Sequence, residues 1–394
     1  MGAARPRVTI VIPAYRNTGL RACLDGIAAL DRSVPFETIV VLNDATDEVR
    51  AIAGEYSGEV QLADIPVNLG VSGAFNHGFA LGTGEYLLQL QDDSIPGPDL
   101  ITALVARAEA VPDAGAIGAL ALNHDDEVLD PGMVVWRSGL TCAGLINGSR
   151  RPDDYVESRA VDYHGSVGML IRRTAWESVG GLDDAFYPAY YGDVDLCFRL
   201  RERGWRVLVE PRAHVRHIGA ASTALGFRQF LTLNLRERFI NRHEAALRRH
   251  GEADSSPAAV DVEVARAAAV PPGPPPAPAT PSERALLRTR LNFSAVEVAK
   301  RERDVRAAYA EHLAHTHTAE AERLVERIAV LESERAADEQ RLTGFRAEMI
   351  ETAEALARAR AELQVVHLAL QGALHDLDQM SSSRSWRFTR WLRR

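Results

Sequence analysis

The chain has 394 residues, 46% of them hydrophobic, which is enough for a large buried core and excludes a small fold held together by disulfides. A formal net charge of -9 excludes general attraction to nucleic acid. The three cysteines, Cys23, Cys142 and Cys197, lie far apart and match no metal-ligand spacing, which indicates buried thiols in a reducing compartment.

The first residues run directly into an apolar strand pattern, with no signal-peptide core. No apolar stretch approaches the roughly 20 residues of a membrane-spanning helix. We therefore expect a cytoplasmic protein that is soluble or attached peripherally to the inner face of a membrane.

Short apolar runs alternate with helical patterns from Arg7 to about residue 122, which predicts an α/β fold with a mostly parallel sheet flanked by helices. The strands are expected at Val8–Ile12, Glu37–Leu42, Val60–Ala63, Tyr86–Leu90 and Ala116–Leu122. The helices between them are expected at Leu20–Leu30, Glu48–Tyr56, Ser72–Leu81 and Asp99–Ala110.

The pattern continues with a strand at Gly165–Arg172, a helix at Asp193–Arg203, and a strand at Arg206–Val209 that Pro211 would stop. A closing helix is expected at Leu225–His250. Trp205 and Phe198 are expected in the core. Together these elements place one domain at residues 1–250.

A change of composition at Gly251 predicts a Pro-rich linker at residues 251–282, in which Pro271–Pro278 would be an extended, solvated spacer. A seven-residue repeat follows and predicts a long α-helical coiled coil within residues 283–380. The repeat positions include Leu342, Met349, Leu356, Leu363, Leu370 and Leu377. A homo-oligomer is the expected consequence, the alternative being a lone solvated helix.

Arginine and tryptophan alternate without acidic residues in the last segment, residues 381–394. Such a basic aromatic tail suits the headgroup layer of an anionic membrane, because the rings embed while the cations meet phosphate. The alternative is a disordered basic tail.

The most informative stretch is Tyr86–Leu90 followed by Gln91, Asp92 and Asp93. Adjacent carboxylates at a strand end repel each other unless a cation lies between them, so a divalent metal, Mg²⁺ or Mn²⁺, is expected there. A polar strand-to-turn junction is the plainer interpretation of the pair taken alone.

Other loops that follow predicted strands carry groups suited to a nucleotide sugar, because ligands of open α/β sheets bind at the carboxyl ends of the strands. Pro13, Ala14 and Tyr15 can present backbone groups and a ring face to a base, and Asp44 can accept from a base or ribose. A helix cap is the plainer role for Asp44. A further loop supplies Asn68 and Gly70.

The order of these motifs over residues 7 to 220 resembles glycosyltransferase family 2, whose members have a GT-A domain. The motifs are Val8–Tyr15, Asn43-Asp44, Asn68-Leu69-Gly70, Gln91-Asp92-Asp93, Gly180–Asp183 with Gly192–Arg199, and Pro211 with His214 and His217. The likeness is closest to branches that make rhamnosyl or galactofuranosyl linkages on cell-envelope glycans.

The resemblance implies Asp193 as the catalytic base and Asp93 and His217 as metal ligands. Asp92 would lie either near the ribose or behind the metal ligands without contacting the ion. Two positions depart from the family pattern. Gln91 replaces the first acid of the acidic motif, and Gly192 replaces the Glu that usually precedes the catalytic Asp.

The expected activity is inverting, metal-dependent transfer of a sugar from a nucleotide-diphosphate donor to a glycan or lipid-linked acceptor in cell-envelope polysaccharide synthesis. A carboxylate such as Asp193 would remove the acceptor proton, and a cation would neutralise the leaving diphosphate. The alternative, favoured by Gln91 and Gly192, is a scaffold that binds nucleotide sugar with weak catalysis and recruits partners through its coiled coil.

Overall fold

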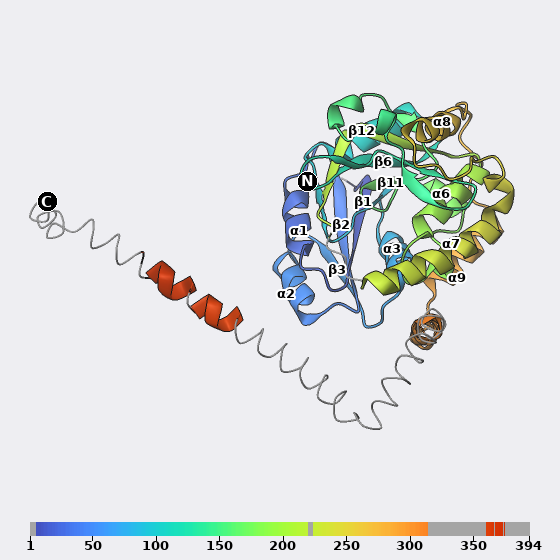
Figure 1. Ribbon diagram of the computed structural model, residues 1–394. Helices are drawn as coiled ribbons and strands as arrows, with labels where there is room; N and C mark the ends of the chain where they lie inside the picture. The colour runs from blue at the N-terminus through green and yellow to red at the C-terminus, as the bar shows by residue number, and fades with distance from the viewer. Residues whose placement is uncertain (1–4, 220–223, 314–359, 366, 373, 375–394) are drawn as a thin grey trace, which may run out of the picture. The chain divides into compact units, whose positions relative to one another are not determined.

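The computed structural model describes residues 5–219, 224–313, 360–365, 367–372 and 374. The chain divides into two units, Met1–Tyr309 and Ala310–Arg394 (Figure 1). Most of the predicted coiled coil and all of the basic tail lie outside the described residues. Two positions of the repeat, Leu363 and Leu370, are helical and exposed. In the part of the chain that is described, no helix has the length and apolarity needed to cross a membrane.

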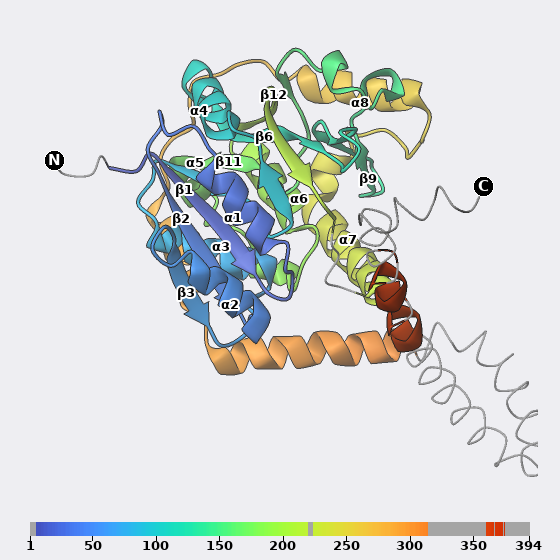
Figure 2. The ribbon, with the colours of Figure 1, turned by 90° about the vertical axis from the view of Figure 1, so that its left-hand side faces the viewer.

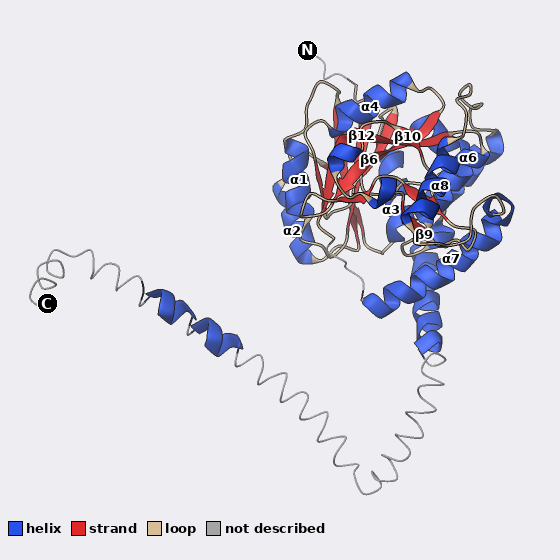
Figure 3. Ribbon diagram, turned by 45° about the horizontal axis from the view of Figure 1, so that its top comes forward, coloured by secondary structure: helices blue, strands red, loops and turns tan. Residues whose placement is uncertain are grey.

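The first unit is built on a twisted sheet with helices on both faces (Figure 3). Among the described residues its strands follow the spatial order β10-β12-β6-β11-β4-β1-β2-β3, with β5 beside β12 and β7 beside β6. Their bounds are β1 Val8–Ala14, β2 Phe36–Asn43, β3 Gln61–Ile65, β4 Tyr86–Gln89, β5 Ser94–Pro96, β6 Ala114–Leu122, β7 Val128–Asp130, β10 Arg159–Ala160, β11 Met169–Arg172 and β12 Arg206–His217. A separate hairpin pairs β8 Met133–Val135 with β9 Thr141–Ala143.

The helices confirm most of the predicted boundaries to within a few residues. Their bounds are α1 Leu20–Ala28, α2 Asp47–Glu55, α3 Gly70–Leu81, α4 Leu100–Ala110, α5 Arg173–Ser178, α6 Gly192–Glu202, α7 Leu225–Leu247, α8 Pro257–Ala268 and α9 Pro281–Leu291. Short 3-10 turns lie at Ile146–Gly148, Pro152–Asp154 and Asp184–Phe186. The predicted α/β architecture is therefore confirmed.

Helices cover both faces of the sheet. Successive side chains of a strand point to opposite faces, so each strand contributes to the core on both sides. Ile10 and Ile12 of β1 pack in one core cluster, while Val11 packs in the other. Phe198 and Trp205 were expected in the core, and both are buried in the cluster that contains Val11.

The strand directions bring distant loops to one edge of the sheet. β1 pairs in parallel with β2 and β4, and β12 pairs in parallel with β6. Because β11 runs antiparallel to both β4 and β6, β12 has the same direction as β1. The carboxyl end of β12, at His217, therefore reaches the same edge as the ends of β1, β2 and β4.

The prediction that Pro211 ends its strand is wrong. β12 continues to His217, and its pairing with β6 shifts between Glu210 and His214. A bulge at this shift leaves the proline without a required ladder hydrogen bond, so the strand passes through it. This bulge is what carries His217 to the edge of the sheet.

The compact unit also extends beyond the predicted domain boundary at residue 250, as far as Tyr309. Residues 251–282 were expected to be a linker, but α8 lies within them and buries Val260 against Val134 and Trp136. The following stretch, Pro271–Pro278, has no helix or strand and is mostly exposed, as expected of a spacer. Local composition indicated the prolines but gave no sign of the packed segments around them.

Candidate active site

A cleft of about 600 Å³ lies at the carboxyl edge of the sheet. Seven of the ten predicted site residues line it: Pro13, Tyr15, Asn68, Gly70, Asp92, Asp93 and His217. The other three, Ala14, Asp44 and Asp193, are not among its lining residues. The strand directions explain the convergence, since these residues follow or end β1, β3, β4 and β12.

Asp93 and His217 face each other across 3.1 Å, measured from the carboxylate Oδ1 to the ring Nε2. The Asp93 side chain is 8% exposed and that of His217 is 26% exposed. Asp93 Oδ1 is buried and accepts no hydrogen bond within the described residues. Two ligands at right angles around an ion with bonds of about 2.1 Å would lie roughly 3 Å apart, so this pair has the donor atoms and the spacing to hold a small divalent cation.

The neighbouring carboxyl of Asp92 is held in an environment that disfavours its charge. Burial and, after it, the charge of Asp93 raise the pKa of Asp92 to about 7. A hydrogen bond from Asn17 Nδ2 to Asp92 Oδ1, at 3.4 Å, opposes that rise. The loop after β1 packs closely against the acidic pair. A Cβ on Gly19 of this loop would lie 3.1 Å from the Asp92 carbonyl oxygen, which leaves little room for a larger residue.

The loop after β1 presents Tyr15 to the cleft, with the Arg16 guanidinium 4.5 Å from the centre of its ring. Ala14 instead lies in the buried core. Asp44 is exposed, with a positive φ of 55°, and its loop is tied to the first because Thr46 N donates to Tyr15 O. Asp44 thus lies beside the cleft but outside its lining.

Asn68 and Gly70 shape the loop before α3. The Asn68 carboxamide oxygen accepts from Gly70 N at 2.8 Å and from Asn43 Nδ2 at 3.1 Å. Gly70 has φ of 70°, and a Cβ there would lie 2.6 Å from the Pro188 carbonyl oxygen. Close approach to the loop of Tyr187 and Pro188 therefore requires glycine at this position.

Asp193 lies at the start of α6, partly exposed and connected to the cleft through one residue. Its carboxylate accepts from Val194 N at 2.9 Å and is also hydrogen-bonded by the Ser166 amide. The Ser166 hydroxyl in turn accepts from Gln91 Nε2 at 2.8 Å, and Gln91 lines the cleft. Burial raises the pKa of Asp193 despite these hydrogen bonds, and the nearby charge of Asp130 adds to the rise.

The structure gives a packing reason for Gly192, where the family pattern has Glu. A Cβ at this position would lie 2.5 Å from Ser72 Oγ. The acidic neighbour of Asp193 is instead Asp130, which ends β7 and accepts from Gly165 N at 3.1 Å. No local pattern marks Asp130 as a site residue, because nothing in the sequence indicates that a short strand some 60 residues upstream contacts α6.

Asp195, two residues along α6, has a different role. Its fully buried carboxylate contacts Arg199 Nε at 2.7 Å, Arg242 at 2.9 Å and His243 Nε2 at 2.9 Å. Burial alone would raise the pKa of Asp195, but these partners outweigh it and hold the pKa well below its usual range. Asp195 therefore locks α6 to α7 and is not available for chemistry.

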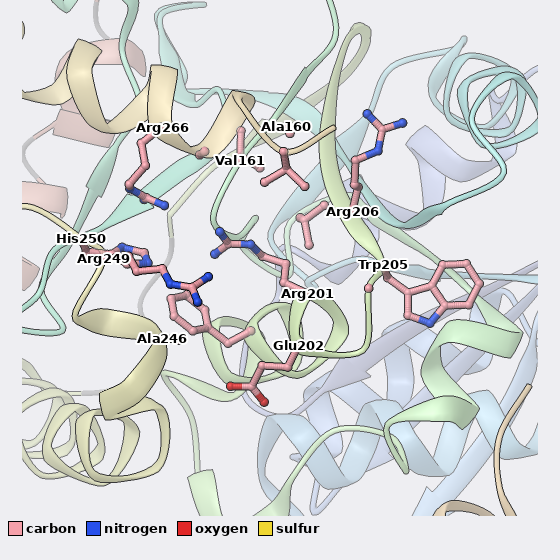
Figure 4. Close-up of a pocket in the computed structure, with 15 residues that line it drawn as sticks. Ala160, Val161, Arg201, Glu202, Trp205, Arg206, Ala246, Arg249, His250 and Arg266 are labelled. Carbon is pink, nitrogen blue, oxygen red and sulfur yellow. The ribbon is translucent and has the colours of Figure 1, made fainter. Parts of the chain in front are cut away.

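Another buried group could be mistaken for a metal site. Among the described residues, Asp162, His250 and Glu263 place one ligand atom each within 4.8 Å of one another. However, His250 Nδ1 is hydrogen-bonded to the Val135 carbonyl, and Arg201 and Arg266 contact the carboxylates. Figure 4 shows these arginines beside a separate pocket of about 310 Å³. Two guanidinium charges already balance two carboxylates, so a cation would be repelled, and we interpret the group as a clamp on α8.

The cleft also includes residues that the motifs did not indicate. Tyr187, Pro188, Ala189 and Tyr190 come from the loop before α6, Phe227 and Arg228 from α7, and Glu302, Val305 and Arg306 from the helix described at residues 295–313. These residues carry no short-range signature, so only the tertiary fold could bring them to the site.

Comparison with known proteins gives the following similarities. Residues 6–238 match the family described as "Glycosyltransferase like family 2". The N-acetylglucosaminyl-diphospho-decaprenol L-rhamnosyltransferase of Mycobacterium tuberculosis is 30% identical over 218 residues, which are 48% of this chain and 68% of that protein. Protein y4gI of Sinorhizobium fredii is 26% identical over 230 residues, 55% of this chain but only 25% of that much longer protein.

Among solved structures, that of GalNAc-T7 with UDP, GalNAc and Mn²⁺ overlaps with a TM-score of 0.49 and 13% identity, over 60% of this chain and 48% of that chain. The family match spans more than half of the sequence and contains the sheet and the cleft described above. The chain therefore belongs to glycosyltransferase family 2 and has a GT-A-like α/β fold.

Proposed function

We propose that this protein transfers a sugar from a nucleotide-diphosphate donor to an acceptor hydroxyl, with inversion at the anomeric carbon. The observation that carries the proposal is the pairing of Asp93 with His217 at 3.1 Å in the cleft at the carboxyl edge of the sheet. Tyr15, Pro13, Asn68 and the other loop residues of this edge would hold the donor nucleotide.

The proposed base is Asp193. Its raised pKa makes the ionised carboxylate a stronger proton acceptor than an ordinary aspartate, and the amides of Val194 and Ser166 keep it oriented. The acceptor oxygen would attack the anomeric carbon as the bond to the diphosphate breaks, and its proton would pass to Asp193. The hydrogen bonds from the Ser166 amide to Asp193 and from Gln91 to the Ser166 hydroxyl support this choice, because they would hold the base near the acidic motif.

Asp93 and His217 would hold a divalent cation, Mg²⁺ or Mn²⁺, with donor phosphates and water completing its coordination. When bound, such an ion supplies charge neutralisation for the departing diphosphate. Asp92, beside it, would stay close to the ribose.

The acceptor proposed here is a glycan or a lipid-linked saccharide of the cell envelope, and the transferred sugar is rhamnose or a related hexose. Similarity to the mycobacterial rhamnosyltransferase supports this choice. The proposal includes a cytoplasmic location at the inner face of the membrane, with the basic aromatic tail as a peripheral contact. It also includes assembly of several copies through the coiled coil.

A scaffold that binds nucleotide sugar without turnover is the second candidate, favoured by Gln91 at the first position of the acidic motif and by the absence of Asp193 from the cleft lining. Two assays separate the candidates. A thermal-shift screen of nucleotide sugars with Mn²⁺ would identify the donor, because a ligand that binds the folded state raises its apparent stability. Donor hydrolysis is then measured with Mn²⁺ or Mg²⁺, and binding without turnover would favour the scaffold.

The coiled-coil part of the proposal has its own test. Sedimentation of the full chain should show an oligomer, and deletion of whole heptads should change product length or activity on membrane-bound acceptors. Unchanged products would contradict the role as a spacer.

A further inference from the structure

The segment after α7 is anchored along the family-matched domain at several points. In α8, Arg266 contacts Asp162, and farther on Gly273 N donates to Asp113 Oδ2 at 2.7 Å. In α9, Arg290 reaches the Gly180 carbonyl at 2.6 Å and Asp183 Oδ2 at 2.6 Å. We call residues 251–309 the C-terminal strap. It lies outside residues 6–238, which match the family.

The last part of the strap, residues 295–309, belongs to a helix that is described from residue 295 to residue 313 and is drawn in orange in Figure 2. Val298 is buried in the main core at 5% exposure. Arg301 contacts Asp184 at 2.7 Å, and the Tyr309 ring lies 4.9 Å from that of Phe227 and 5.2 Å from that of Phe230, measured between centroids. These contacts fix the rotation of the helix about its axis.

This rotation turns Glu302, Val305 and Arg306 into the wall of the cleft. Arg306 is two-thirds exposed and is held by Glu302 at 2.6 Å. Arg306 lines the same cleft as Tyr15, from the loop after β1, and Tyr187, from the loop before α6.

Charges of both signs line the cleft. Asp92 and Asp93 follow β4 and His217 ends β12, while Arg16, Arg228 and Arg306 come from the loop after β1, from α7 and from the strap helix. A guanidinium fork matches the oxygens of a phosphate, and Arg306 is exposed enough to leave Glu302 for a stronger anion. A cleft lined by both acids and arginines suits a phosphate group that binds together with a cation, because the acids can hold the cation and the arginines can bind the phosphate oxygens.

We propose that the strap helix is part of the substrate site and that Arg306 binds a phosphate of the substrate, either the diphosphate of the donor or a phosphate on a lipid-linked acceptor. The inference rests on the proposed function for the identity of those substrates. Glu302 acts as the internal competitor that holds Arg306 while the cleft is empty.

The test uses the full-length protein and isothermal titration calorimetry with two probes. UDP, GDP and dTDP, each with Mn²⁺, represent the donor side, and a short prenyl phosphate represents the acceptor side. Arg306→Ala should weaken binding of one probe by about tenfold, and Arg306→Lys should recover part of the loss because charge remains without the fork. Glu302→Gln should tighten the same probe a few-fold, an opposite sign that a merely structural role would not give.

Arg303→Ala is the matched control, since Arg303 is on the same helix, is exposed and does not line the cleft. Loss of nucleotide binding assigns Arg306 to the donor, and loss of prenyl phosphate binding alone assigns it to the acceptor. If wild type binds a nucleotide and Arg306→Ala binds every probe as tightly as wild type does, the inference is overturned while the proposed function stays intact. If wild type binds none of the nucleotides, the proposed function fails, and prenyl phosphate alone tests the role of Arg306. Weaker binding of prenyl phosphate by Arg306→Ala than by wild type then supports the inference. Equal binding by both proteins, or no binding by wild type, overturns it.

Discussion

Two aspartates on α6, separated by one residue, should differ in how much stability the fold loses when each is replaced by asparagine. Asp195 is fully buried among Arg199, Arg242 and His243, whereas Asp193 has backbone amides as hydrogen-bond partners. Asp195→Asn removes the charge that compensates these cations, and removing one partner of a buried ion pair costs about 3–5 kcal/mol. Arg242 keeps its contact with Asp183 at 2.8 Å and is 34% exposed, so we expect the lower end, about 3 kcal/mol.

For a unit of about 300 residues, a loss of about 3 kcal/mol lowers the midpoint of thermal unfolding by about 5 °C. The measurement is differential scanning calorimetry of wild type, Asp195→Asn and the matched control Asp193→Asn, which should unfold close to wild type. The pH dependence gives a second check. Because the folded pKa of Asp195 is lowered, its stabilisation is present above the unfolded pKa of about 4 and is lost as the pH falls below it.

The difference between wild type and Asp195→Asn should therefore shrink when unfolding is measured below about pH 4. A midpoint for Asp195→Asn within about 2 °C of wild type would refute the reasoning, because it would mean that the buried cations do not need this carboxylate. Equal destabilisation by the two substitutions would refute the separation of roles along α6.

Three further predictions concern the proposed chemistry and the packing beside it. Asp193→Asn should lower kcat by about 10²–10⁴-fold and leave donor binding, measured by calorimetry, unchanged. In the wild type, kcat should fall with decreasing pH at a pKa above the usual carboxyl range, because the base must be ionised and the pKa of Asp193 is raised. A fall of kcat at the ordinary carboxyl pKa would contradict the environment assigned to Asp193. His217→Ala should weaken donor binding with Mn²⁺ by at least about tenfold and leave binding in EDTA unchanged, and an equal loss in both conditions would argue against a ligand role. Gly192→Ala should destabilise the fold by about 1–3 kcal/mol in urea unfolding, because its Cβ would meet Ser72 Oγ at 2.5 Å, and adding Ser72→Gly should relieve most of that loss.

The alternation of short apolar strands and helices was enough to predict the central sheet, because strands covered on both faces keep a strong hydrophobic signal. The bulge at Pro211 was not predictable in this way, since proline inside an apparent strand normally ends it and the compensating register shift depends on β6. The meeting of Asp93 and His217 followed from family resemblance, but its physical reason is the common direction of β4 and β12, which only the pairing with β11 reveals.

The remaining site residues could not be read from local patterns. Asp130 reaches Asp193 only because β7 folds back on β6, and no spacing rule links positions 63 residues apart. The packing of the strap could not be predicted, because its prolines dominate the local composition. Arg266 and Arg290, which help to anchor it, have their partners more than 100 positions earlier in the sequence.

The anchoring of the strap decides where this catalytic body can be cut and exchanged. The family match ends at residue 238, but Arg290 of α9 still binds the Gly180–Asp183 turn, and Tyr309 still packs against Phe227 and Phe230 of α7. A chimera joined near residue 250 would leave Leu287 and Val298 without the apolar surface that they cover. A domain exchanged between relatives should therefore extend through the position of residue 309, so that each catalytic domain keeps its own C-terminal strap.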